Sequence, residues 1–169
     1  DKSDERALMY FLEKGIPPWW NVSKEMPFLQ EKRLQEFFVS VSFIKLFREK
    51  ITKKSVQSRL INQFLDKEIK TLLEHTFQKE NVQISILQKA IVEKFMGLKP
   101  TVRTLIWKLY LDYFLQKKET VFLKELVVLL ELENARKDPQ KKTNKLMEIV
   151  LLISREFNVP ITNKLTLAA

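Results

Sequence analysis

The chain has 169 residues, 45% of them hydrophobic and 30% charged, so it can bury a core and is too apolar to be an intrinsically disordered protein. Its formal net charge is +9, which favours acidic partners, and it contains two glycines and no cysteine. The lack of cysteine excludes disulfides and thiol catalysis, and the shortage of glycine excludes the glycine-rich loops that bind phosphates or dinucleotides.

Helical periodicity predicts a first helix that is capped by Ser3 and ends near Lys14. Gly15 follows as the residue that ends the helix in the left-handed conformation. Residues 15–27 then form a connection that opens with the sequence GIPPWW. The two prolines fix their own φ and bias the residues before them toward extended geometry. The chain should therefore leave the helix in a stiff, extended direction.

Two short helices with phenylalanine-rich faces are expected next. Their apolar residues are Leu34, Phe37, Phe38 and Val41 in the first, and Phe43, Ile44 and Phe47 in the second. Ser55 and Asp66 are then expected to cap a fourth and a fifth helix. A sixth helix over residues 82–96 should end at Gly97.

Three longer helices are expected in the second half of the chain. Pro100 begins the first, at a position where its missing N–H costs nothing, and Trp107 lies in the middle of this helix as an expected core residue. Thr120 begins a strongly apolar helix. Residues 138–139, an Asp-Pro pair, have the pattern of an N-cap and first turn for the last helix, which should end near Phe157.

These patterns predict an all-α fold, a compact multi-helix bundle of roughly eight or nine short to medium helices. We expect a single domain over residues 1–158 and a C-terminal tail over residues 159–169. Because the sequence begins at Asp1 without an apolar leader, we expect it to be a piece of a longer protein. The longest apolar runs, at 126–130 and 149–153, are far too short to span a bilayer, so no membrane partner is expected.

The chemistry of enzyme sites is not found in the sequence. His75 is the only histidine and is expected at the surface. A metal site needs several convergent His, Cys or acidic ligands, and a catalytic triad needs an oriented nucleophile beside its histidine. The sequence therefore predicts no enzyme activity, no catalytic residue, no cofactor and no metal.

Trp19 and Trp20 are two of only three tryptophans, and they allow two interpretations. In an extended segment they point to opposite sides. Both could hold the first helix against the rest of the fold, which we favour because large aromatic side chains bury well inside domains. Alternatively they dock onto another chain, because preorganised aromatic groups make strong interface contacts.

Two stretches resemble tape-measure proteins of bacterial contractile injection systems. ALMYFLEKGIPPWW is similar to the family's Leu/Phe-rich helix, glycine, short spacer and Pro-Trp-Trp. The matching residues are Leu8, Tyr10, Phe11, Leu12, Gly15, Pro18, Trp19 and Trp20. SRLINQFLDKEIKTLLE is similar to an Arg-Leu-x-x-Gln-Phe element followed by an acidic residue and a leucine-rich helix. Its matching residues are Arg59, Leu60, Gln63, Phe64, Asp66, Leu72 and Leu73. Together they cover roughly the first half of the chain.

The resemblance implies a non-enzymatic structural role in the assembly or length control of the inner tube of a phage-tail-like particle. It implies protein partners, namely inner-tube components, baseplate or cap components, or other copies of the chain. It also implies that the protein is in the bacterial cytoplasm during assembly and then within the particle. The candidate interaction and structural residues are Gly15, Pro18, Trp19, Trp20, Arg59 and Gln63. Arg59 and Gln63 share a helix at i,i+4 spacing and could make buried or interfacial hydrogen bonds.

Two alternatives stay open. The first is a helical nucleic-acid-binding module that contacts phosphates through two basic clusters. The clusters are Lys45, Arg48, Lys50, Lys53 and Lys54, and Arg136, Lys137, Lys141, Lys142 and Lys145. The second is a generic helical adaptor, which predicts an exposed apolar groove around Phe37, Phe38 and Phe43.

Overall fold

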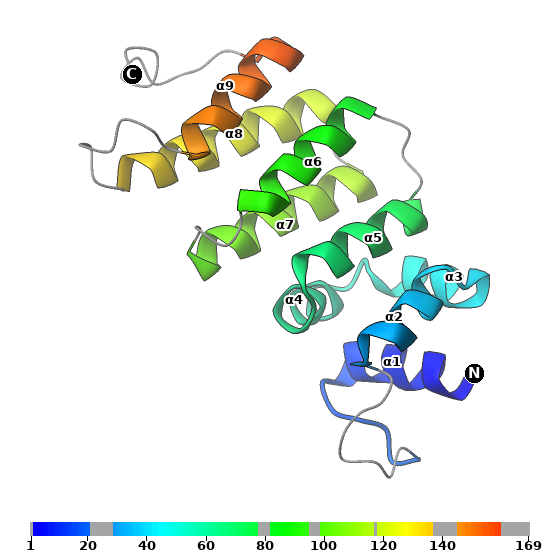
Figure 1. Ribbon diagram of the computed structural model, residues 1–169. Helices are drawn as coiled ribbons and strands as arrows, with labels where there is room; N and C mark the ends of the chain where they lie inside the picture. Colours follow the sequence, from blue (N-terminus) through cyan, green and yellow to red (C-terminus); the bar gives the residue numbers. More distant parts are fainter. Residues whose placement is uncertain are drawn as a thin grey trace. The chain divides into compact units, whose positions relative to one another are not determined.

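A computed structural model describes residues 2–20, 29–77, 82–94, 99–116, 118–136 and 145–159. Over these ranges the chain forms nine α-helices and no strand, which confirms the predicted all-α fold (Figure 1). Contacts between the helices divide the chain into two compact units, residues 1–79 and residues 80–169. The single domain over residues 1–158 and the tail after it stay predictions.

The first unit contains five helices. They are α1 (Lys2–Lys14), α2 (Glu31–Phe38), α3 (Val41–Lys50), α4 (Lys54–Gln63) and α5 (Asp66–Phe77). Helix α1 packs against α3 and α4, and α5 packs against α2, α3 and α4 (Figure 1). Stacked phenylalanines form much of the core, with ring centroids 5.8 Å apart for Phe37 and Phe43 and 6.0 Å apart for Phe43 and Phe47. The three- and four-residue spacing of the phenylalanines gives each short helix one buried face.

The boundary between α2 and α3 differs from the sequence prediction. The sequence predicts Val41 on the buried face of the earlier helix, and this is wrong, because α2 ends at Phe38 and Val41 is 83% exposed. The cause is a serine cap. The hydroxyl of Ser40 accepts a hydrogen bond from the backbone N–H of Phe43 at 3.4 Å, which starts α3 at Val41.

Three predicted caps are also wrong. Ser3 lies inside α1, which begins at Lys2. Helix α4 begins before Ser55, with Lys53 as its N-cap and no hydrogen bond from a capping side chain. Asp66 is the first residue of α5 rather than its cap. There the carboxylate of Glu68 accepts a hydrogen bond from the backbone N–H of Leu65 at 2.8 Å. An acidic residue in the first turn therefore supplies the hydrogen-bond partner that a capping residue would otherwise give to this N–H.

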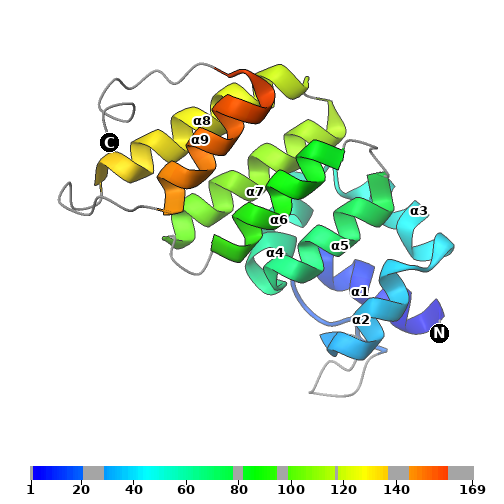
Figure 2. The ribbon, with the colours of Figure 1, turned by 45° about the horizontal axis from the view of Figure 1, so that its top comes forward.

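The second unit contains four helices in two layers. They are α6 (Val82–Lys94), α7 (Pro100–Leu115), α8 (Glu119–Arg136) and α9 (Lys145–Phe157). Helix α8 packs against both α7 and α9, and α9 also packs against α6 (Figure 2). The predicted helix start at Pro100 is confirmed, and α8 begins one residue before Thr120. The predictions for Gly97, for residues 138–139 and for the end of the C-terminal tail lie outside the described residues.

Aromatic rings fill the centre of the second unit. Trp107 is fully buried, which confirms its predicted place in the core. Its ring centroid lies 5.8 Å from that of Tyr110, which in turn lies 4.8 Å from that of Phe122 on α8. Among the helices described, none is long and apolar enough to cross a membrane.

Tyr110 carries a buried hydroxyl that has no hydrogen-bond partner among the described residues. Burial raises the pKa of this phenol well above its usual value, and Tyr113 adds to the rise. An unpaired buried hydroxyl lowers stability. Tyr110→Phe is therefore expected to raise the free energy of unfolding by about 1 kcal/mol in urea titrations. A loss of stability of that size would contradict this account, because it would mean that the hydroxyl is bonded in the folded chain.

Candidate protein interaction site

The GIPPWW segment, residues 15–20, begins where α1 ends. The backbone N–H of Gly15 donates to the carbonyl oxygen of Phe11 at 2.8 Å, and the φ of Gly15 is 81°. This hydrogen bond and the left-handed glycine are the usual combination at a helix C-terminus. The predicted role of Gly15 as the residue that ends the first helix is therefore confirmed.

Arg59, on α4, contacts this same helix end. Its Nη1 donates to the carbonyl oxygen of Leu12, one of the last carbonyls of α1, which have no partner within the helix. A Cβ added to Gly15 would lie 2.9 Å from Nη2 and 3.0 Å from Cζ of Arg59. The positive φ therefore favours glycine at position 15, and any side chain there would also push the guanidinium of Arg59 aside. The two stretches that carry the family resemblance meet at this contact.

Side-chain contacts along its length hold α1 against the other helices of the unit. Arg33 donates to Asp4, and the hydroxyls of Ser40 and Ser42 both donate to the carboxylate of Glu5. At the other end of α1, Glu13 pairs with Lys53 at 3.1 Å and with Lys50 at 3.6 Å. These contacts fix the end of α1 and with it the start of the GIPPWW segment.

The ion pairs of Glu13 give unit 1 a dependence on pH. Burial raises the pKa of Glu13, but the hydrogen bond from Lys53 and the charge of Lys50 outweigh it, so the pKa is lowered on balance. A carboxyl whose pKa is lower in the folded chain stabilises that chain above its unfolded pKa. This contribution is lost as the pH falls through the folded pKa.

Glu13→Gln is expected to lower the free energy of unfolding at pH 7 by about 0.5 kcal/mol, since exposed ion pairs contribute little. The difference between variant and parent should shrink below about pH 4, where the carboxyl of the parent becomes protonated. Urea titrations at pH 7, 5 and 3 measure this, with Glu49→Gln on the exposed side of α3 as the control. A difference that stays constant over this range would contradict the ion-pair explanation.

The two tryptophans of the GIPPWW segment are not part of the core. Pro18 is buried, whereas Trp20 is 38% exposed and Trp19 is 86% exposed. The ring of Trp20 lies edge-on to Tyr10 of α1, with centroids 5.5 Å apart, and Trp19 lies edge-on to Trp20 at 5.8 Å. Trp20 therefore packs on α1, as the first interpretation expects, and Trp19 does not. The exposure of Trp19 favours the second interpretation, docking onto another chain.

The last candidate residue, Gln63, lies apart from this group. It is exposed near the end of α4, one turn beyond Arg59, and its side chain makes no hydrogen bond with the described residues. Arg59 contacts the helix end at Gly15, Pro18 is buried, and Trp20 is the residue whose ring contacts Trp19. Within the ranges that the structure describes, no group of three His, Asp or Glu side chains is arranged to hold a metal ion.

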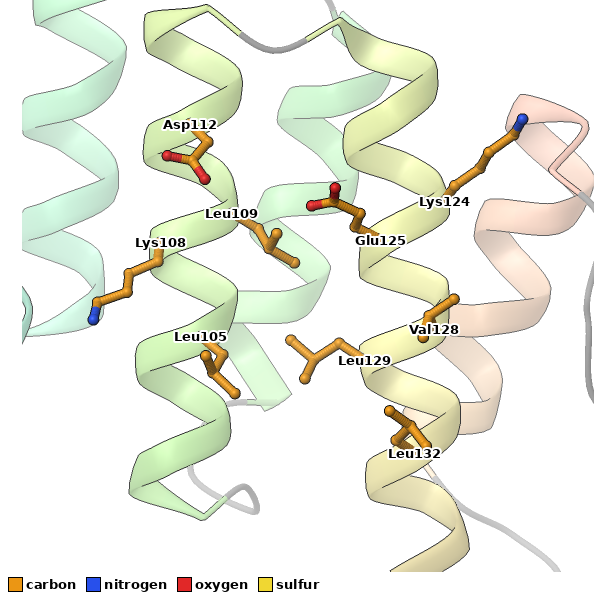
Figure 3. A pocket seen from close by; sticks show the side chains of 9 residues that line it. All are labelled: Leu105, Lys108, Leu109, Asp112, Lys124, Glu125, Val128, Leu129 and Leu132. Carbon is orange, nitrogen blue, oxygen red and sulfur yellow. The ribbon is translucent and has the colours of Figure 1, made fainter.

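A second candidate surface lies between α7 and α8, and the sequence did not predict it. The α7/α8 groove has a volume of about 490 Å³ and lies on the outer side of these two helices (Figure 3). Its lining residues are Leu105, Lys108, Leu109, Asp112, Lys124, Glu125, Val128, Leu129 and Leu132. The groove predicted by the adaptor alternative is not found, because Phe37, Phe38 and Phe43 are all buried.

The first basic cluster is largely engaged within unit 1. Lys50 and Lys53 pair with Glu13, and Arg48 donates to the backbone carbonyl of Thr76. Lys45 and Lys54 remain exposed on α3 and α4. Most of the second cluster, residues 137 to 142, lies outside the described residues. His75 is exposed, as predicted.

Comparison with known proteins gives one match. A family model for the contractile injection system tape measure protein matches residues 1–164. The match confirms the resemblance seen in the first half of the chain and extends it over the second half. The comparisons with curated proteins and with solved structures found no match.

Proposed function

Because this chain belongs to the contractile injection system tape measure protein family, we propose that it is the docking part of such a protein and attaches to other proteins while the inner tube is assembled. The observation that carries the proposal is the GIPPWW segment. It holds Trp19 86% exposed on a base of buried or packed residues. An aromatic side chain presented in this way is typical of interface hot spots.

Docking is a better role for this chain than measuring. A ruler must span a long distance, but an α-helix advances only about 1.5 Å per residue. The longest described helix has 18 residues, and the helices of each unit fold back against one another. Packed helices therefore span only a short distance per residue. They do form a rigid surface, which suits attachment to inner-tube, baseplate or cap proteins.

The proposed role is non-enzymatic and needs no cofactor. In this proposal the protein is in the bacterial cytoplasm during assembly and then in the finished particle.

Nucleic-acid binding is the weaker candidate, because Lys50, Lys53 and Arg48 of the first basic cluster already have partners within the chain. A salt-sensitive mobility shift with duplex DNA or single-stranded RNA would favour that candidate.

Particle morphology tests the proposal. In-frame deletion of the region that encodes this chain is expected to give tubes of aberrant length or no tubes in electron micrographs. The Trp19→Ala, Trp20→Ala double variant should reproduce much of this defect, because it removes the exposed rings and leaves the core intact. Val41→Ala, which shortens another exposed side chain of unit 1, is the matched control. Normal tubes of unchanged length after the deletion would overturn the proposal.

A further inference from the structure

The exposed Trp19 contacts a second aromatic ring that packs on α1. Trp19 lies against Trp20, Trp20 lies against Tyr10 of α1, and Pro18 is buried directly before them. The ring contact with Trp20 gives the side chain of Trp19 a preferred position, which lowers the entropy lost when it inserts into a partner. The segment therefore presents a large, exposed apolar group to another surface.

The α7/α8 groove offers an apolar surface that an indole ring such as that of Trp19 can contact. Its floor and lower edges are formed by Leu105, Leu109, Val128, Leu129 and Leu132 (Figure 3). Leu132 is 59% exposed, and Leu105 and Val128 are also exposed. Contiguous exposed apolar side chains mark binding sites, and a groove of about 490 Å³ lies in the size range of ligand pockets. An indole ring fits within such a volume.

The α7/α8 groove has two acidic residues at one end (Figure 3). Glu125 on α8 extends its carboxylate toward α7, and Asp112 on α7 lies at the same end of the groove, while Lys108 and Lys124 extend away from it (Figure 3). The indole N–H of tryptophan is a hydrogen-bond donor only, and Lys14, directly before the GIPPWW segment, is exposed. A ring that enters the groove thus brings an N–H donor toward the end where Asp112 and Glu125 lie.

We propose that Trp19 of one copy of the chain inserts into the α7/α8 groove of a second copy. This inference rests on the proposed docking function and names one partner of the docking segment, another copy of the same chain. Each copy carries one docking tryptophan and one groove. Two copies can therefore exchange the contact reciprocally and close as a dimer, or copies can join head to tail in a row or a ring.

Sedimentation velocity on the purified chain of 169 residues tests this contact. The parent chain is expected to form dimers and larger species as its concentration rises. The measurement needs at least 0.15 M salt, because copies with a net charge of +9 repel one another at low ionic strength. Trp19→Ala and Leu132→Glu should each raise the dissociation constant roughly tenfold or more. Both positions are exposed, so both variants should fold, which circular dichroism checks.

The decisive experiment mixes the two variants. The Trp19→Ala chain keeps its groove and the Leu132→Glu chain keeps its tryptophan, so one contact can still form between them. The mixture should give heterodimers and nothing larger, at concentrations where each variant alone associates roughly tenfold or more weakly than the parent. Val41→Ala should associate like the parent. Undiminished association of Trp19→Ala would overturn the inference, since the groove would then bind another part of the second copy.

A parent chain that stays monomeric at all accessible concentrations would also overturn the inference. It would leave the proposed function standing, because that function is tested separately by particle morphology. Defective particles together with a monomeric chain would mean that the GIPPWW segment docks onto a different protein of the particle. The two failures are therefore distinguishable.

Discussion

Replacing Trp107 with alanine is expected to lower the free energy of unfolding of the second unit by about 3–5 kcal/mol. The side chain is fully buried and contacts Tyr110, which itself contacts Phe122 of α8. Removal of the indole leaves a cavity at the centre of four packed helices. The neighbouring rings cannot fill this cavity, because their places are fixed by their own helices.

Hydrogen exchange of the amides of α7 and α8 is the suitable measurement, because it reports the opening of this unit by itself. Trp19→Ala is the matched control. It removes the same side chain from a position that is 86% exposed, and its effect on stability should stay within about 0.5 kcal/mol. Equal effects of the two substitutions would contradict the assignment of Trp107 to the core.

Replacing Gly15 with alanine is expected to lower the free energy of unfolding of the first unit by about 2 kcal/mol. About 1 kcal/mol of this comes from the left-handed φ of residue 15, which a side chain disfavours. The remainder comes from the new Cβ, which would lie 2.9 Å from Nη2 of Arg59. The guanidinium has to shift to make room, and a shift that breaks its hydrogen bond to Leu12 costs about 1 kcal/mol.

A double-mutant cycle separates these two contributions. In the Arg59→Ala background the close contact is absent, so Gly15→Ala should cost only about the 1 kcal/mol that the backbone conformation requires. Urea unfolding followed by circular dichroism supplies the four free energies. Gln63→Ala, one turn away on α4, is the control for changes in that helix. Additive effects of the Gly15 and Arg59 substitutions would exclude the contact as the cause.

The helical periodicity of the sequence predicted the fold class and most helices. Apolar residues three and four positions apart, such as Phe43 and Phe47, correspond to buried faces. Helix starts were predicted less well, because several polar residues in a row compete for each cap. Ser40 caps α3, whereas Ser55 lies inside α4, and nothing local in the sequence distinguishes the two serines.

The candidate site was only partly predictable. The sequence indicated that Gly15 ends a helix and that Trp19 and Trp20 are unusual neighbours. It did not indicate that Arg59 reaches Leu12, because that contact joins residues 47 positions apart and depends on how α1 and α4 pack. The exposure of Trp19 depends in the same way on the tertiary fold.

The α7/α8 groove had a weak signal in the sequence that was missed. Leu105 and Leu109 on α7, and Val128 and Leu132 on α8, lie one turn apart on faces that the core does not use. Both helices are apolar on more than one side, which indicates burial on more than one side. In a helix as apolar as α8, such a stripe is hard to distinguish from the core face until the packing partners are known.

The contact between Arg59 and the end of α1 has a consequence for the order of events during synthesis. The GIPPWW segment leaves the ribosome before Arg59 does, so its base is incomplete until α4 has been made. Both parts of the contact belong to the first unit, which ends at Lys79. Domains generally fold as units from the N-terminus during translation. We therefore expect Trp19 to reach its final orientation while α7 and α8 are still being translated, so that the docking residue of each new chain is ready before its own groove exists.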